Sequence, residues 1–93
     1  MLNEQNEENV LRVSAASNPQ SVASAIAHAI YDSRKVLLRA VGAGAVNQAV
    51  KAIAISRGYA APRGFNLVTI PGFANVESRD GTISAIVFTV IAI

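Results

Sequence analysis

Residues 35–58, KVLLRAVGAGAVNQAVKAIAISRG, contain the pattern that decides the fold. The apolar run at residues 35–41 predicts a strand, and the glycines within residues 42–44 predict a tight turn directly after it. Apolar residues then recur at helical spacing, which predicts a helix that ends where Gly58 takes a left-handed cap. A strand that turns at once into a helix indicates an α/β protein.

The predicted helix has two apolar faces. One stripe is expected to face the sheet and consists of Val46, Val50 and Ile53. The other has only small side chains, namely Ala45, Ala49, Ala52 and Ser56. Small side chains let two helices approach closely, so this stripe predicts a contact with either the first helix or a partner subunit. Ile55 would otherwise face water, and it completes a candidate oligomer interface with Ala45, Ala49 and Ala52.

The same strand-then-helix order precedes this unit. Residues 10–14 (VLRVS) alternate in polarity and predict a first strand. Asn18 and Pro19 predict a helix start, because asparagine is a good N-cap and proline is favoured at the first helical position. Apolar residues at helical spacing continue this helix to about residue 32 or 33.

Two further strands are predicted after the second helix. Residues 66–70 predict a third strand that stops at Pro71-Gly72, and residues 82–91 predict a long fourth strand after a turn at Asp80-Gly81. The segment between them, residues 72–81, is expected to protrude as a hairpin arm. The predicted order is therefore β-α-β-α-β-β.

This order predicts an α/β two-layer sandwich. Two strand-helix-strand steps imply parallel strands with right-handed crossovers, which place both helices on one face of the sheet. The other face stays partly open. Alternation along the first two strands directs Arg12 and Arg39 toward that open face.

The composition excludes several classes of protein. Hydrophobic residues make up 52% of the 93 residues and charged residues 15%, which indicates one domain with a core rather than a disordered chain. The chain has no cysteine and one histidine, His28, so we expect no disulfide, no metal site, no cofactor and no histidine-dependent catalysis. The sequence predicts a binding or assembly module and not an enzyme.

Charge is distributed unevenly along the chain. Three of the six acidic residues lie within residues 1–9, which we expect to be a flexible acidic lead-in to a single domain at residues 10–93. That domain has eight basic residues against three acidic ones, a net charge of about +5, which suits a polyanionic partner. Without a signal peptide or a membrane-spanning run in the sequence, a cytoplasmic location and no membrane partner are expected.

The two β-to-α turns are the candidate functional feature. Because the strands are parallel, the turns at residues 14–18 and 42–44 emerge at the same sheet edge, and each opens a helix whose free N–H groups attract anions. The candidate nucleic-acid contacts are Arg12, Ser17, Asn18, Arg39, Gly44, Asn47, Gln48 and Lys51. The alternative is structural: Asn18 is then only a helix cap, and the glycines only make a turn.

Two other motifs carry weaker signals. The Gly42-x-Gly44 pair follows a strand, as in dinucleotide-binding proteins, but Asn47 stands where the third glycine belongs, and the chain is too short for that fold. The segments at residues 57–59 (RGY) and 63–65 (RGF) place arginine near an aromatic ring, as proteins that stack nucleobases do. A helix cap followed by an anchoring ring is the commoner explanation of such a motif.

Three segments resemble a known bacterial family. Similarity to the stage V sporulation protein S family is carried by VLRVSAASNPQSVASAIA at residues 10–27, AVGAGAVNQAVKAIAISRGYAAPRG at residues 40–64 and LVTIPGF at residues 67–73. The similarity extends from residue 10 to about residue 73 without an obvious gap.

That family is related to the Alba-like proteins. The resemblance implies a mixed four-stranded sheet in the order 1-2-4-3 with strand 4 antiparallel, a homodimer or higher homo-oligomer, and non-enzymatic regulation in sporulation through nucleic-acid binding. Alba proteins contact nucleic acid through lysines in the first β-to-α loop, whereas the matching residues here are Ala15, Ala16 and Ser17. With few bases to neutralise phosphates, binding is expected to be weak and salt-sensitive.

Two functions stay open at this point. The first is a dimeric regulator that binds DNA or RNA, with Arg12, Arg39 and Lys51 supplying the charge. The second is a protein-interaction or assembly module that keeps the fold but no longer binds nucleic acid. The missing loop lysine and the stripe of small residues favour the second.

Overall fold

The computed structural model describes residues 10–93, so the predicted acidic lead-in lies outside the described residues. The elements follow in the order β2 (Val10–Val13), α1 (Pro19–Ser33), β3 (Lys35–Ala40), α2 (Ala43–Ala60), the 3-10 helix η1 (Ala61–Arg63), β4 (Leu67–Ser78) and β5 (Gly81–Ala92). This order of strands and helices is the one predicted from the sequence. Within residues 10–93, no helix has both the length and the apolar character needed to cross a membrane.

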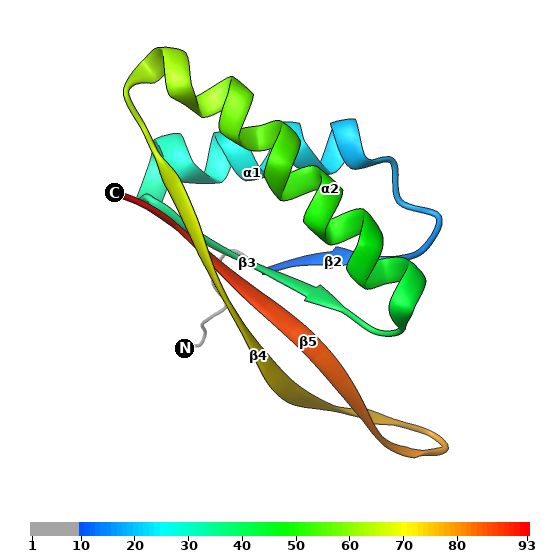
Figure 1. The fold of residues 1–93 in the computed structure, drawn as a ribbon. Helices are drawn as coiled ribbons and strands as arrows, with labels where there is room; N and C mark the ends of the chain where they lie inside the picture. The colour runs from blue at the N-terminus through cyan, green and yellow to red at the C-terminus, as the bar shows by residue number, and fades with distance from the viewer. Residues whose placement is uncertain (1–9) are drawn as a thin grey trace.

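The four strands form one mixed sheet in the order β2-β3-β5-β4 (Figure 1). Strands β2 and β3 are parallel, and β5 runs antiparallel to both of its neighbours, β3 and β4. Both helices lie on one face of the sheet, and among residues 10–93 no helix covers the other face, here called the open face (Figure 1). The two-layer sandwich and the sheet order with an antiparallel fourth strand are therefore confirmed.

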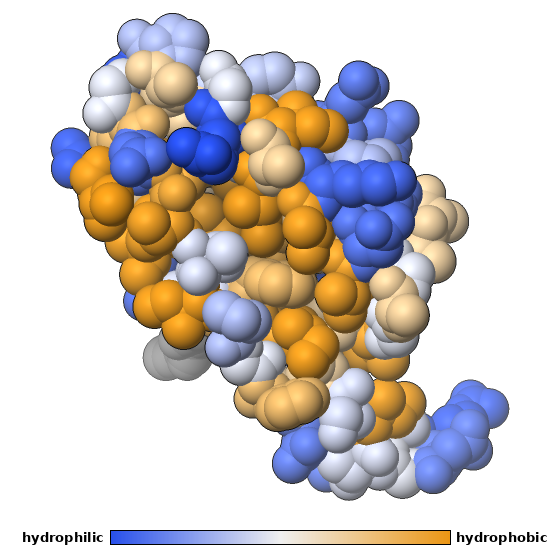
Figure 2. Space-filling view, in the orientation of Figure 1, coloured by the Kyte–Doolittle hydropathy of each residue, from blue (hydrophilic) through white to orange (hydrophobic). Residues whose placement is uncertain are grey.

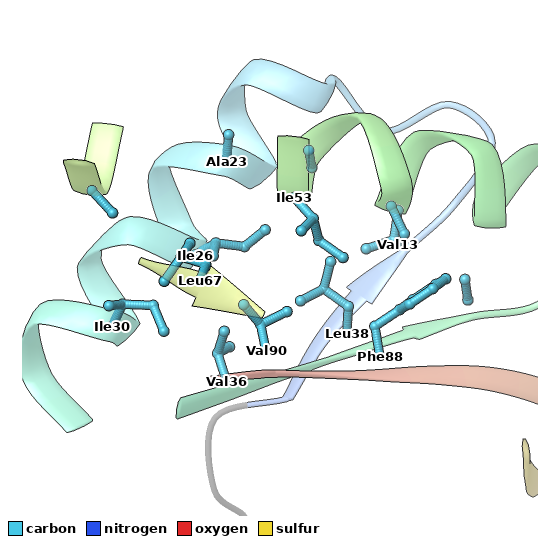
Figure 3. Close-up of a cluster of buried hydrophobic side chains, with 14 of the residues drawn as sticks. Val13, Ala23, Ile26, Ile30, Val36, Leu38, Ile53, Leu67, Phe88 and Val90 are labelled. Carbon is cyan, nitrogen blue, oxygen red and sulfur yellow. The ribbon is translucent and has the colours of Figure 1, made fainter. Parts of the chain in front are cut away.

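The core lies between the helices and the sheet (Figure 3). Its large side chains come from both layers and include Ile26, Ile30, Leu38, Ile53, Phe88 and Val90. Burying one such side chain typically stabilises a fold by about 1.5–3 kcal/mol. The alternation predicted for β3 holds, because Val36, Leu38 and Ala40 are all fully buried.

Helix α1 begins and ends where the sequence predicts. The side chain of Asn18 accepts hydrogen bonds from the backbone N–H groups of Gln20 (2.8 Å) and Ser21 (3.1 Å), and Pro19 takes the first helical position. The helix ends at Ser33, after which Arg34 adopts a left-handed conformation with a φ of 66°. A residue other than glycine is uncommon in that conformation.

Helix α2 is longer than predicted. It continues through Gly58 to Ala60, and the left-handed glycine is Gly64, which follows η1. A glycine inside a helix is unfavourable by about 1 kcal/mol relative to alanine, which a well-packed helix can absorb. Burial of Ala60 in the core keeps this last turn helical.

The prediction that Val46, Val50 and Ile53 form the sheet-facing stripe of α2 is also wrong in part. The buried face is mainly the small-residue stripe, in which each residue is at most 3% exposed: Ala45, Ala49, Ala52 and Ser56. Val50 is instead 50% exposed. Small side chains let α2 pack closely against α1, which is its most extensive partner.

This burial corrects the candidate oligomer interface. Ala45, Ala49 and Ala52 are covered by the chain itself, so they are not at the surface where a second subunit could touch them. Of the two partners that the sequence left open for this stripe, the first helix is the one observed. Ile55, which is half-buried, is the one member of the predicted set left partly exposed.

Strand β4 does not stop at Pro71-Gly72 as predicted but continues to Ser78. It is the last strand of the sheet, and an edge strand tolerates proline because one side of its backbone has no ladder partner. Strands β4 and β5 pair along their full length, whereas β3 pairs with β5 only as far as Ile86. The remainder of the hairpin extends beyond β3, so the predicted arm is confirmed (Figure 1).

Candidate nucleic-acid interface

The two β-to-α turns lie side by side. Val13 and Ala40, the last residues of β2 and β3, are partners in the sheet, so both turns leave it at the same edge. The side-chain Nε2 of Gln48 on α2 donates a hydrogen bond of 2.8 Å to the carbonyl oxygen of Ser17 in the first turn. A Cβ added to Gly44 would lie 2.9 Å from the Cβ of Ala15, so the start of α2 packs directly on the first turn.

The first turn satisfies its own polar groups. The backbone N–H of Ser14 donates to Oγ of Ser17 (2.9 Å), and the N–H of Ala16 donates to Oγ of Ser14 (3.2 Å). Oδ1 of Asn18 is taken up by two N–H groups of α1. These oxygens therefore hold the turn and cap the helix, which is the structural role that the sequence left open for Asn18.

The second turn is more open. Helix α2 follows Gly42, whose φ of 91° suits glycine, and no side chain caps its first turn. The free N–H groups of that turn carry the positive end of the helix dipole, where anions bind favourably. Asn47 is exposed one turn further along the helix. Of the two predicted anion-attracting turns, the one at Gly44 is thus the better suited.

Arg12 and Arg39 lie next to each other on the open face of the sheet. They are register partners in β2 and β3, one residue before the ends of these strands. Within residues 10–93 neither arginine forms an ion pair. Beside them, in the same face, is an apolar groove of about 360 Å³ whose lining includes Leu37, Ile70 and Val87.

Lys51 is not part of this basic pair. It is exposed on α2 and lines a separate groove of about 450 Å³ on the helical layer, together with Asn18, Pro19 and Ile55. The sheet separates this groove from the open face that carries Arg12 and Arg39. The structure therefore places the predicted basic residues in two locations, and only the arginines are brought together.

The fold and the sequence both point to known proteins. A model of the family described as Stage V sporulation protein S (SpoVS) matches residues 9–93. This chain belongs to the SpoVS family. The resemblance carried by the three segments is thereby confirmed, and the match continues through the hairpin arm and β5.

The SpoVS chain also resembles a solved structure. Alba from Thermoplasma volcanium superposes with a TM-score of 0.62 at 17% sequence identity, and the match covers 89% of this chain and 99% of that one. At this identity the likeness establishes a shared fold. The Alba-like architecture expected from the sequence is confirmed.

The sequence predicts only part of one cluster of arginine and aromatic side chains in this SpoVS chain. The RGF motif at residues 63–65 places Arg63 near Phe65, but it does not predict that Tyr31 and Arg34, from the end of α1, join them. In the structure the guanidinium carbon of Arg63 lies 4.1 Å from the ring centre of Tyr31, and that of Arg34 lies 5.2 Å from the ring centre of Phe65.

The described part of the SpoVS chain offers little for metal chemistry. Among residues 10–93, no three histidine, aspartate or glutamate side chains gather in a group that could hold a metal ion. His28 is exposed on α1, with its ring centre 6.4 Å from that of Tyr31.

Proposed function

We propose that this protein is a non-enzymatic regulator of the SpoVS type that binds DNA or RNA as a homodimer. Family membership and the Alba-like fold support a sporulation-related regulatory role. The observation that carries nucleic-acid binding is the pair formed by Arg12 and Arg39 at the sheet edge where α2 begins.

Two like charges at this spacing favour an anion between them. The Cα atoms of paired residues on adjacent strands are about 4.8 Å apart, so the two guanidinium groups repel each other unless an anion compensates them. Arginine binds phosphate through two parallel N–H donors, which gives both charge and geometry. A phosphate backbone that passes along this sheet edge would meet the arginines on one side and the free N–H groups of α2 on the other.

The affinity for nucleic acid is expected to be modest. Each phosphate that a protein neutralises lowers the slope of log K against log salt by roughly 0.9 for duplex DNA and about 0.7 for a single strand. Two arginines and one helix N-terminus give few contacts in each subunit. A dimer would double them, which makes dimerisation part of the binding mechanism.

The dimer is proposed at α2 and the edge strand β4, where apolar side chains remain exposed. Phe73 on β4 is 83% exposed, and Val50 on α2 is 50% exposed. Figure 2 shows a broad hydrophobic area over α2 and the β4–β5 pair. A large apolar surface of this kind on a small domain is typical of a subunit contact.

The test is the salt dependence of binding by the variant R12Q/R39Q. We expect binding to labelled RNA and duplex DNA to weaken, and the salt slope to fall by about 2.8 to 3.6, because a dimer loses four phosphate contacts, two in each subunit. K51Q/R79Q is the matched control for charge, since Lys51 and Arg79 both lie away from the arginine pair. An unchanged affinity and slope for R12Q/R39Q would refute the site.

A second function is favoured by the apolar groove beside the arginine pair. Its lining by Leu37, Ile70 and Val87 suits a protein segment better than a phosphate backbone. If the wild-type protein binds neither DNA nor RNA at low salt, a protein-interaction module with the same fold becomes the better explanation.

A further inference from the structure

Four side chains form a continuous stack at the end of the molecule where both helices finish. In order they are Arg63, Tyr31, Phe65 and Arg34, hereafter the Arg–aromatic stack. The guanidinium carbon of Arg63 lies 4.1 Å from the ring centre of Tyr31, whose ring centre lies 6.0 Å from that of Phe65. Arg34 covers Phe65 at 5.2 Å.

The rings of the stack are fixed in place. The hydroxyl of Tyr31 donates a hydrogen bond of 3.0 Å to the carbonyl oxygen of Tyr59, which ties the end of α1 to the end of α2. Phe65 packs against the core, and its backbone N–H donates to the carbonyl oxygen of Ala60 (3.2 Å). The two arginines therefore rest on a rigid base.

Both arginines of the stack are exposed. Within residues 10–93 neither Arg34 nor Arg63 forms an ion pair. A guanidinium group that lies over a ring still directs its N–H donors outward in its own plane. Each arginine thus presents an oriented, unpaired set of donors to solvent.

The backbone conformation of Arg34 is unusual for an arginine. It ends α1 with a φ of 66°, a position at which glycine is favoured because other residues are strained there. Strained residues of this kind concentrate at functional sites. An arginine in this conformation is consistent with a use for its side chain.

Basic residues are concentrated near the Arg–aromatic stack. Half of the eight basic residues of the chain lie in the two segments that meet here, residues 28–35 and 57–65, namely Arg34, Lys35, Arg57 and Arg63. The only acidic residue in these segments is Asp32. This end of the molecule therefore carries more basic residues than the predicted turns.

We infer that the Arg–aromatic stack is a second phosphate-contact site, at which Arg34 and Arg63 bind the backbone of the nucleic acid that also contacts Arg12 and Arg39. This inference rests on the proposed function and extends it. Along β3 the stack lies near the start of the strand and the arginine pair near its end, a separation of about 17 Å for six residues. Phe65 of the stack packs against the core on the helix-bearing side, whereas Arg12 and Arg39 lie on the open face, so a nucleic acid that contacts both sites would pass around the end of the sheet.

The experiment compares variants of the full chain in binding to a fluorescein-labelled 20-nucleotide RNA and a duplex DNA of the same length. For R34Q/R63Q we expect about tenfold weaker binding at low salt and a salt slope smaller by roughly 2.8 to 3.6, since a dimer loses two phosphate contacts in each subunit. R34K/R63K keeps the charge and is expected to retain most of the slope. R79Q removes a charge in the hairpin turn, outside both proposed sites, and its slope should match the wild type.

A single variant separates binding from structural support. R34G relieves the left-handed strain, so its melting temperature should equal or exceed that of the wild type while its binding weakens. If R34Q/R63Q and R34G bind with wild-type affinity and slope, the inference is overturned and the proposed function stands. If the wild-type protein does not bind either nucleic acid at low salt, both are overturned.

Discussion

The packing between the two β-to-α turns makes Gly44 the most informative position for a stability test. A Cβ placed on Gly44 would lie 2.9 Å from the Cβ of Ala15, closer than real Cβ atoms approach each other. The methyl group of Ala15 has no other rotamer, so only a backbone shift could relieve the contact. Such a shift would disturb the hydrogen bond from Gln48 to Ser17.

The expected magnitude follows from two opposing effects. Overpacking of this kind destabilises by about 1–3 kcal/mol. Replacing glycine in a helix by alanine stabilises by up to about 1 kcal/mol, and by less in a first turn. We therefore expect Gly44→Ala to lower the free energy of unfolding by about 1–2 kcal/mol, or the melting temperature by roughly 5–10 °C for a domain of this size.

Urea and thermal unfolding followed by circular dichroism measure this change. Ala15→Gly removes the opposing methyl group, so the double variant A15G/G44A should recover stability, with a coupling energy of about 1–2 kcal/mol. Gly58→Ala is the matched control, because Gly58 lies inside the same helix and a Cβ added there has no atom within 4 Å. This variant should be more stable than the wild type by about 0.5–1 kcal/mol. A Gly44→Ala protein as stable as the wild type would refute the close packing of the turns.

Three further outcomes are expected. Phe73→Glu replaces the highly exposed Phe73 by a charged residue and should shift the protein from dimer to monomer in light scattering. A wild-type protein that is already monomeric would contradict the proposed interface. Asn18→Ala removes the acceptor for the N–H groups of Gln20 and Ser21 and should cost about 1 kcal/mol in urea unfolding; no change would contradict the cap. Gln48→Leu loses the bond to Ser17 and should cost about 0.5–1.5 kcal/mol by the same assay.

Much of the fold is predictable because local pattern and tertiary structure agree. The alternation along β3 predicts its buried side, and Asn18-Pro19 predicts the start of α1. The side-by-side position of Arg12 and Arg39 follows from the same alternation once two strands are parallel. These features depend on short-range patterns that the sheet preserves.

The errors arise where tertiary context overrides a local signal. Pro71-Gly72 is a turn signal in isolation, but pairing with β5 along an edge strand keeps it extended. Gly58 is a typical helix end, yet burial of Ala60 keeps the helix intact. On α2, hydrophobicity alone predicts that Val50 is buried. The close packing of α2 against α1 instead buries the alanines.

The candidate site is only partly predictable for a related reason. Local motifs identify the turns and the arginine beside Phe65. They do not predict that Tyr31, distant in sequence, inserts between Arg63 and Phe65, since that contact depends on where the ends of α1 and α2 meet. They also do not predict that Lys51 lies apart from the arginine pair, because only the folded structure shows that Lys51 is on the helical layer and the arginines are on the sheet.

The central claim, that this Alba-like SpoVS chain binds nucleic acid, is tested most directly by titrating the wild-type protein against labelled RNA and duplex DNA over a range of salt concentrations. Fluorescence anisotropy should give a micromolar Kd at low salt, and log K should fall linearly with log salt with a slope of about 3 or more, as expected for the four arginines of the two pairs in a dimer. Absence of binding to both nucleic acids at low salt would contradict the account.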